Sequence, residues 1–241
     1  MYPSIESSVS DIVTANWNIT NGTVVPETDD IVMKNGGRLV EATYAYADLA
    51  DSSTIAQYLN KEVAATIIRA FVNSATRIFR NFDGEIRSFD GDRVMAIFIG
   101  EKKNWNAVRA AYAIEWAVTE VIRPKLKSHW DWSDTPKKLY EISHRVGIDT
   151  GESLIVRGGA RDNSDLISVG GAPNIAAKLS DLKSGYSTYI TDRVLDDIDD
   201  EALLYVSSNG RKEKCFTKLL RPVEIGGTYN TVYGSNVYWG L

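Results

Sequence analysis

Cysteine and histidine are nearly absent from this chain of 241 residues. Cys215 is the single cysteine, so no disulfide can form within the chain and no cysteine cluster is present for zinc. The two histidines, His129 and His144, are too few for a metal site built on imidazole. Zinc sites of either kind are therefore poor candidates.

An excess of positive charge is missing too. The formal net charge is −5 and the pI is about 5.2, so no overall basic field attracts nucleic acid or anionic lipid. The longest apolar runs fall well short of the roughly 20 residues that span a bilayer. The N-terminal "MYPSIESSVSDIV" lacks the basic and apolar regions of a signal peptide. We therefore expect a cytoplasmic protein that binds neither nucleic acid nor a membrane.

The chain has enough apolar residues for a well-filled core, since 44% are hydrophobic and 10% aromatic. Residues 1–36 are polar and show no periodic pattern, which indicates an N-terminal leader or arm. We expect the ordered catalytic domain to occupy residues 37–241.

Periodicity and turn residues predict the elements of the first half. They are a strand at residues 38–49, one long amphipathic helix at 52–82, a β-hairpin at 84–100 and a second long helix at 105–127. Tyr44, Tyr46 and Asp48 share one face of the first strand because side chains alternate. The hairpin is centred on Asp90-Gly91, since this dipeptide tolerates the positive φ angles of a tight turn.

The second half contains shorter elements. They are a strand, turn and strand at residues 144–158, a strand at "DLISVGG", a helix at 172–183 with Pro173 in its first turn, and strand-like segments "STYITDRVL" and "LLYVSS". This order indicates an α+β fold in which one mixed sheet carries helices on one face. A homodimer would cover the other face and bring residues of two chains into one cleft.

Two aspartates end neighbouring strands of this predicted sheet. Asp48 closes the strand at 38–49, and Asp92 follows the hairpin turn. A turn aspartate by itself more often caps its own backbone. If Asp48 and Asp92 lie side by side, however, they repel unless a divalent cation lies between them. Magnesium accepts such carboxylates together with substrate phosphates, and two ions about 4 Å apart suit phosphoryl transfer.

Four segments, in this order, resemble the motifs of class III nucleotide cyclases: "YADLADSS", "FDGDRVMAIF", "RVGIDTGE" and "ISVGGAPNIAAKLSDL". The similarity extends over residues 38–195. It implies a class III cyclase catalytic domain with a ferredoxin-like βαββαβ core, a mixed or antiparallel sheet and a head-to-tail homodimer. It also implies that Asp48 and Asp92 hold two Mg²⁺ or Mn²⁺ ions per site, assisted by the Leu49 carbonyl.

The same resemblance implies residues that bind the nucleotide. The triphosphate would be held by backbone N–H groups at the start of the following helix, those of Ala50, Asp51, Ser52 and Ser53. Asn174 matches the ribose-orienting asparagine of the family. Lys178 stands where the family has an arginine that stabilises the transition state, and lysine keeps the charge but loses the bidentate fork. Arg161 is a candidate phosphate-binding arginine. Without the motifs, Lys178 would be a solvated helix lysine and Arg161 an exposed loop arginine.

The base-selecting positions match neither purine code. Ser88 replaces the lysine of adenylate cyclases or the glutamate of guanylate cyclases, and Ile167 cannot form a hydrogen bond to a purine edge. Arg93 in "FDGDRVMAIF", with "VGGAPNIAAKL", resembles the pyrimidine cyclases of bacterial Pycsar antiphage systems, whose cyclic UMP or cyclic CMP activates a separate effector protein. Tyr46, on the Asp48 face, is a candidate to narrow the pocket for a smaller base, or else a sheet-packing tyrosine. Arg93 is a pocket residue or a surface arginine.

The resulting hypothesis is a homodimeric pyrimidine nucleotide cyclase that prefers UTP to CTP and releases pyrophosphate. Each of two sites would combine Asp48 and Asp92 of one chain with Ser88, Ile167, Asn174 and Lys178 of the other. The alternatives are a cytidylate cyclase, an adenylate or other purine cyclase with an unusual pocket, and a cyclase-like module that only binds nucleotide or only dimerises. A polymerase-palm-like enzyme would share acidic residues on a similar sheet, but the helix motif around Asn174 has no place in it.

Overall fold

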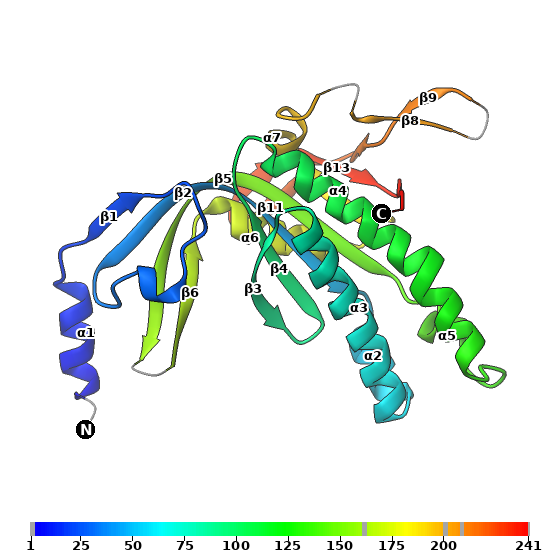
Figure 1. Ribbon diagram of the computed structural model, residues 1–241, viewed down its shortest axis with the longest axis horizontal. Coiled ribbons are helices and arrows are strands. Elements are labelled where there is room, and N and C mark those ends of the chain that lie inside the picture. Colours follow the sequence, from blue (N-terminus) through cyan, green and yellow to red (C-terminus); the bar gives the residue numbers. More distant parts are fainter. Residues whose placement is uncertain (1–2, 161–162, 200–201, 208–209, 241) are drawn as a thin grey trace.

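Two long antiparallel strands, β2 (Gly36–Leu49) and β5 (His144–Ala160), cross the centre of the computed structural model (Figure 1). The structure describes residues 3–160, 163–199, 202–207 and 210–240. At one end of the molecule lie α1 and the β6 hairpin, and at the other end lie α2, α3 and α5 (Figure 1). The two ends of the β2–β5 ladder therefore carry different sets of elements.

The other strands extend this central pair on both sides. The sheet order is β10, β13, β7, β5, β2, β4, β3, with β6 also paired to β5 and β1 paired to β2. The bounds are β1 (Asn18–Asn21), β3 (Glu85–Asp90), β4 (Arg93–Phe98), β6 (Asn163–Val169), β7 (Thr188–Thr191), β10 (Thr217–Lys218) and β13 (Val232–Ser235). The β1–β2 and β5–β7 pairs are parallel and the others antiparallel, so the predicted mixed sheet is confirmed.

The helices and two small ladders complete the architecture. The helices are α1 (Ile5–Val13), α2 (Ser52–Tyr58), α3 (Lys61–Asn81), α4 (Lys103–Trp116), the π-helical η2 (Ala117–Ile122), α5 (Arg123–His129), α6 (Gly171–Ser180) and α7 (Asp192–Leu195), with short 3₁₀ turns η1 (Thr28–Asp30) and η3 (Lys137–Leu139). The small ladders pair β8 (Leu204–Val206) with β9 (Lys212–Lys214) and β11 (Val223–Ile225) with β12 (Thr228–Asn230). Within the described part of the chain, no helix is both long enough and apolar enough to cross a membrane.

Alternating side chains of β2 enter two different cores. Ala45, Ala47 and Leu49 are buried in a large cluster with residues of α3 and α4. Ala42 and Tyr44 are buried on the opposite face, in a cluster that includes residues of α6. The expectation that helices cover only one face of the sheet is therefore wrong, because α6 covers part of the second face.

Two further expectations about the elements are corrected. The helix predicted over residues 52–82 is broken, because Leu59 is extended and the Asn60 side chain caps a new helix by accepting from the Val63 amide. The strand, turn and strand predicted at 144–158 are one strand, β5, which pairs with β2 through the expected turn. Gly151 accommodates its bend with a φ of 155°.

Smaller differences concern turns and ends. The two residues between β3 and β4 are Gly91 and Asp92, one position later than predicted, and Gly91 takes the positive φ of 62°. The segment "STYITDRVL" is a strand only as far as Thr191, where α7 begins. The arm before residue 37 contains α1 and β1, neither of which was predicted. The division of the chain at residue 37 stays a prediction.

Candidate active site

The hairpin places Asp92 beside the end of β2. Asp48 is opposite Arg93 in the β2–β4 ladder, and Asp92 precedes Arg93 in the turn. The side chains of directly opposite residues lie on the same face of a sheet. Arg93 donates from Nε and Nη2 to the two carboxylate oxygens of Asp48, each at 3.4 Å. Asp48, Asp92 and Arg93 therefore form one half-buried charged cluster.

The electrostatics of this cluster favour a bound cation. Burial raises the pKa of Asp48, and the nearby charges of Asp92 and Asp181 raise it further, against the opposing effect of Arg93. Asp92 Oδ2 is buried and has no hydrogen-bond partner among the residues that the structure describes. A divalent cation would neutralise the mutual repulsion of the two carboxylates and give the buried oxygen a ligand. Asp48 and Asp92 thus fit the predicted metal site.

Asp48 and Asp92 are the two carboxylates of this predicted metal site. Among the residues that the structure describes, no group of three or more His, Cys, Asp or Glu side chains is placed to hold a metal. Magnesium sites commonly use one or two carboxylates and complete their shell with water and substrate phosphates. The arrangement therefore suits a cation that is shared with a phosphorylated ligand.

Asp181 was not anticipated as part of this site. It follows α6 directly, and its Oδ1 accepts from Arg93 Nη2 at 2.5 Å. It lies within the segment "ISVGGAPNIAAKLSDL", but that resemblance assigned it no role, since it lies 89 residues beyond Asp92 and only the fold brings α6 to the hairpin. Arg93 is therefore held between two carboxylates, Asp48 and Asp181.

The start of α2 adjoins Asp48 in sequence. Asp51 adopts a left-handed conformation, with φ of 58°, immediately before the helix. The Ala50 amide donates to the Ser143 carbonyl at 2.9 Å, so it is already used within the fold. Amides in the first turn of a helix have no partner within that helix. The amides of Asp51, Ser52 and Ser53 are thus the better candidates of the predicted set for an anion.

Helix α6 carries Asn174 and Lys178 on an exposed face one turn apart. Asn174 Nδ2 donates to the Gly170 carbonyl at 3.0 Å and lines a cavity of about 480 Å³. Arg193 also lines this cavity, and its Nη2 donates to buried Asp149 at 2.6 Å. Arg193 is thus a basic residue at the same cavity as Asn174, and the sequence did not point to it.

The predicted base-pocket residues fall into two groups. Tyr46 and Ser88 both pair with Met95, so they lie in one row across β2, β4 and β3, two positions along β2 from Asp48. Burial raises the pKa of Tyr46, as expected for a phenol beside a core. Ile167, in contrast, is 50% exposed on β6.

Ile167 lies at the far end of the central ladder. It pairs with Val156, which pairs with Gly37, eleven residues from Asp48 along β2. At about 3.3 Å per residue this separation is roughly 36 Å. One chain therefore does not bring Ile167 to its own Asp48. Arg161 lies outside the described residues.

Known proteins resemble this chain closely. A uridylate cyclase of Rhodovulum sp. (strain MB263) is 45% identical over 194 residues, covering 80% of each chain. A uridylate cyclase of Xanthomonas perforans is 38% identical over 234 residues, covering 96% of this chain and 94% of the relative. No family model matches the sequence.

Solved structures share the fold. The adenylyl cyclase CyaB from P. aeruginosa superposes with a TM-score of 0.67 at 17% identity, covering 83% of this chain and 95% of that one. The resemblance to class III nucleotide cyclases and the α+β catalytic-domain fold are thereby confirmed. This chain belongs to the uridylate cyclase family, and it is a nucleotide cyclase with the class III fold.

Proposed function

We propose that the enzyme converts UTP to 3′,5′-cyclic UMP and pyrophosphate. The observation that carries this proposal is the pair Asp48 and Asp92, which converge beside Tyr46 and Arg93 in a chain whose relatives are named uridylate cyclases. In this reaction the ribose 3′-oxygen attacks the α-phosphorus, a P–O bond closes the ring, and the bond to the pyrophosphate oxygen breaks. Cytidylate and adenylate cyclase activity are the enzymatic alternatives.

Asp48, Asp92 and the Leu49 carbonyl would hold the divalent cations, Mg²⁺ or Mn²⁺. Bound there, such ions activate the attacking oxygen and neutralise charge on the leaving group. The amides of Asp51 to Ser53 would bind the triphosphate at the start of α2. Their nearness in sequence to Asp48 supports this, since phosphate and cation must be adjacent.

The chain's other residues would position the ribose and stabilise developing charge. Asn174, exposed at a cavity, would orient the ribose, and Lys178 would place its ammonium on the transferring phosphoryl group. Tyr46, half-buried in the row with Ser88, would leave room for a pyrimidine rather than a purine. Arg161 would contact phosphate.

We further propose that two chains form each site in a head-to-tail homodimer. The supporting observation is the roughly 36 Å that separates Ile167 from Asp48 within one chain. In an antiparallel pair, the β6 end of one chain meets the Asp48 end of the other, which would bring Ile167 to the base. A role in phage defence, through an effector that senses the product in the cytoplasm, is the corresponding biological proposal.

The test is incubation of the purified protein with each of the four ribonucleoside triphosphates and Mn²⁺ or Mg²⁺, followed by mass spectrometry. Cyclic UMP as the main product is expected. Cyclic AMP as the main product would refute the pyrimidine proposal and leave the cyclase assignment intact. A nonhydrolysable UTP analogue that binds while UTP yields no pyrophosphate would favour a nucleotide-binding module instead.

The variant Asp48→Ala tests the proposed metal site. We expect it to reduce turnover by a factor of about 10³ or more, because the cations lose a ligand that also positions the reacting phosphate. Its thermal melting temperature should stay near that of the wild type, since burial disfavours the Asp48 charge and Arg93, which loses its 3.4 Å contact to Asp48, keeps its ion pair with Asp181. A variant that retains activity would remove Asp48 from the proposed metal site.

A further inference from the structure

Helix α1 presents an apolar face that is exposed in its own chain. The residues of this face are Ile5, Val9, Ile12 and Val13, which are 82%, 52%, 60% and 76% exposed. They recur at the spacing of one helical stripe. The helix is well formed, because Ser4 caps it by accepting from the Ser7 amide at 3.1 Å, yet none of its residues is buried.

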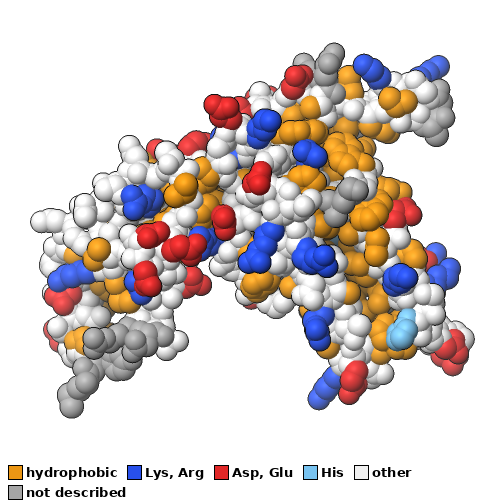
Figure 2. Space-filling view, viewed as in Figure 1, with side chains coloured by type: hydrophobic (Ala, Val, Ile, Leu, Met, Phe, Trp, Pro, Cys, Tyr) orange, Lys and Arg blue, Asp and Glu red, His pale blue; other side chains and the backbone are white. Residues whose placement is uncertain are grey.

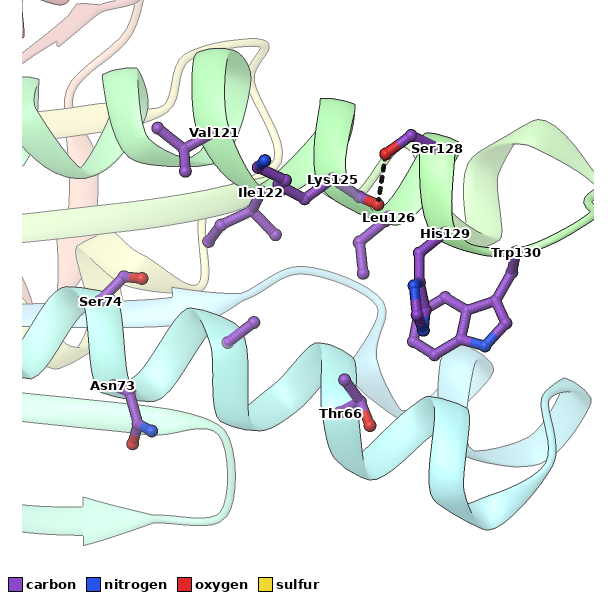
Figure 3. Close-up of a pocket in the computed structure, with 11 residues that line it drawn as sticks. Thr66, Asn73, Ser74, Val121, Ile122, Lys125, Leu126, Ser128, His129 and Trp130 are labelled. Atoms are coloured by element: carbon purple, nitrogen blue, oxygen red, sulfur yellow. Dashed lines mark hydrogen bonds between the residues drawn. The ribbon is translucent and has the colours of Figure 1, made fainter.

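A groove between α3 and α5 is the complementary feature of the molecule. It encloses about 620 Å³, and its apolar lining includes Ala70, Ile122, Leu126 and Trp130. Figure 3 shows Ile122 and Leu126 pointing from the upper helix toward α3, with Trp130 closing one end. In the space-filling view, hydrophobic side chains lie exposed beside a histidine at the α5 end (Figure 2).

The charges of these two surfaces are opposite. Among the described residues that line the groove, the ionisable ones are Lys125 and His129, and none is acidic. Helix α1 contains Glu6 and Asp11 and no basic residue. Glu6 follows Ile5 and flanks the apolar stripe, because successive helical residues are about 100° apart. If α1 packs its apolar face into the groove, Glu6 would therefore lie near the basic residues Lys125 and His129.

The helix does not reach the groove of its own chain. Residues 14–17 join α1 to β1 and span at most about 18 Å when extended. Strand β1 pairs with β2 only as far as Leu39, and the ten residues from Leu39 to Leu49 cover about 33 Å more. Helices α3 and α5 lie at the Leu49 end of β2, at the opposite end of the molecule from α1 (Figure 1).

We propose that α1 docks in the α3–α5 groove of a second copy of this chain. Val9 and Ile12 enter the groove, and Glu6 faces Lys125. This inference rests on the head-to-tail pairing proposed above. In that pairing the end of one chain with α1 and β6 meets the end of the other chain with α3 and α5. The exchange is reciprocal, so two such contacts form per dimer.

Cross-linking between differently substituted copies tests the contact. Val9→Cys protein is mixed with Ala70→Cys protein, and after subunit exchange is verified by native mass spectrometry a short bismaleimide is added. The native Cys215 is buried and gives little background. We expect a Val9–Ala70 cross-linked dimer. Ser7→Cys is the matched control, because Ser7 lies on the opposite side of α1, and it should give less than a tenth of that product with Ala70→Cys.

Two outcomes overturn the proposal. One is a Val9→Cys protein that cross-links to itself instead, which would mean that two α1 helices pair with each other. The other is a yield with Val9→Cys no greater than with Ser7→Cys. Cyclic nucleotide formation is measured in the same samples, so active enzyme without the cross-link would refute the docking alone. A cross-link in enzyme without turnover would refute the proposed activity alone.

Dimer affinity provides a second measurement. Val9→Asp places a charge in the apolar groove and should raise the dimer dissociation constant by roughly tenfold or more, as judged by sedimentation. Ser7→Asp should leave that constant within about twofold, because its side chain faces solvent. Equal effects of the two variants would contradict the proposed seating of α1.

Discussion

At the scale of single residues, Arg93 is the most informative side chain. It is shared between Asp48, at 3.4 Å, and Asp181, at 2.5 Å. A guanidinium and a divalent cation compete for the same carboxylate oxygens. If Asp48 holds a cation as proposed, the shorter contact to Asp181 would keep Arg93 from competing for Asp48, and Asp181 would act as a positioning residue.

Substitution of Asp181 should therefore change metal binding. In Asp181→Asn the side chain that binds Arg93 loses its charge, so Arg93 should pair more tightly with Asp48. The Mn²⁺ concentration for half-saturation should then rise roughly tenfold, as expected for one charge-assisted hydrogen bond. Electron paramagnetic resonance of free Mn²⁺, with a nonhydrolysable UTP analogue present, measures this directly. Asp181→Glu should restore most of the affinity. Unchanged Mn²⁺ binding in Asp181→Asn would exclude this function.

His144 makes stability depend on pH. It is buried against Phe71, and neither ring nitrogen has a hydrogen-bond partner in the described part of the chain. Burial lowers its pKa to about 4 despite the carboxylate of Glu115 at 3.6 Å. Because the folded-state pKa lies below the unfolded value of about 6.5, the unfolded chain binds the proton more tightly. The contribution of neutral His144 to the free energy of unfolding is therefore complete above pH 6.5, and it is lost as the pH falls toward 4.

The expected loss is roughly 1.4 kcal/mol for each pH unit within that window. Urea denaturation at pH 7 and pH 5 measures it. His144→Leu should reduce the difference between the two pH values, since the buried ionisable group is gone. An unaltered pH dependence in His144→Leu would contradict the assignment.

At the scale of elements, local patterns predicted the strands and helices that position the site. The hairpin, β2 and α6 were predicted because alternation, a turn glycine and a helix-starting proline act within a few residues. The break at Leu59 was missed because residues on both sides of it share one apolar stripe. Only the Asn60 cap marks the new helix, and the apolar periodicity that runs past this single residue outweighed it in the prediction.

The continuous strand β5 was missed for a different reason. "DTGE" contains the residues of a turn, but Gly151 remains paired with Ala42 in the ladder. The local preference for a turn is overridden by the long partner strand, which lies about a hundred residues earlier in the sequence. Contacts over such separations leave no local pattern, and the same is true of Asp181 and Arg193 at the site.

The packing of α6 on β5 depends on one glycine. A Cβ at Gly147 would lie 2.2 Å from the Ala176 carbonyl oxygen and 2.5 Å from the Ser180 nitrogen. Gly147→Ala should therefore push α6 off the sheet and destabilise the fold by roughly 1–3 kcal/mol. Gly171→Ala is the control, since its Cβ would meet only Ile175 Cδ1 at 3.9 Å. Urea midpoints compare the two, and equal midpoints would show that α6 is less closely packed than described.

At the scale of the whole molecule, the proposed sites predict complementation between inactive variants. Asp48→Ala and Lys178→Ala should each be nearly inactive alone. In a mixed dimer, one site carries both substitutions and the other carries neither. After random subunit exchange half of the dimers are mixed, so about one quarter of wild-type activity should return. Cyclic UMP formation before and after mixing measures this, with Asp48→Ala mixed with Asp92→Ala as the control that should stay inactive.

A mixture of Asp48→Ala and Lys178→Ala that stays inactive despite verified exchange would place Asp48 and Lys178 of one site in the same chain. The sequence alone could not decide this point. The position of Ile167 relative to Asp48 is fixed by the register of β6 on β5 and of β5 on β2, and neither register is encoded within a short segment.

The long β2–β5 ladder also has a consequence for synthesis of the protein. Because β2 is made early and its partner β5 begins only at His144, the nascent chain emerges from the ribosome with one flank of a long apolar strand unpaired. Strands β4 and β3 can cover the other flank soon afterwards. The interval until β5 arrives is when the chain is most exposed to aggregation and to binding by chaperones.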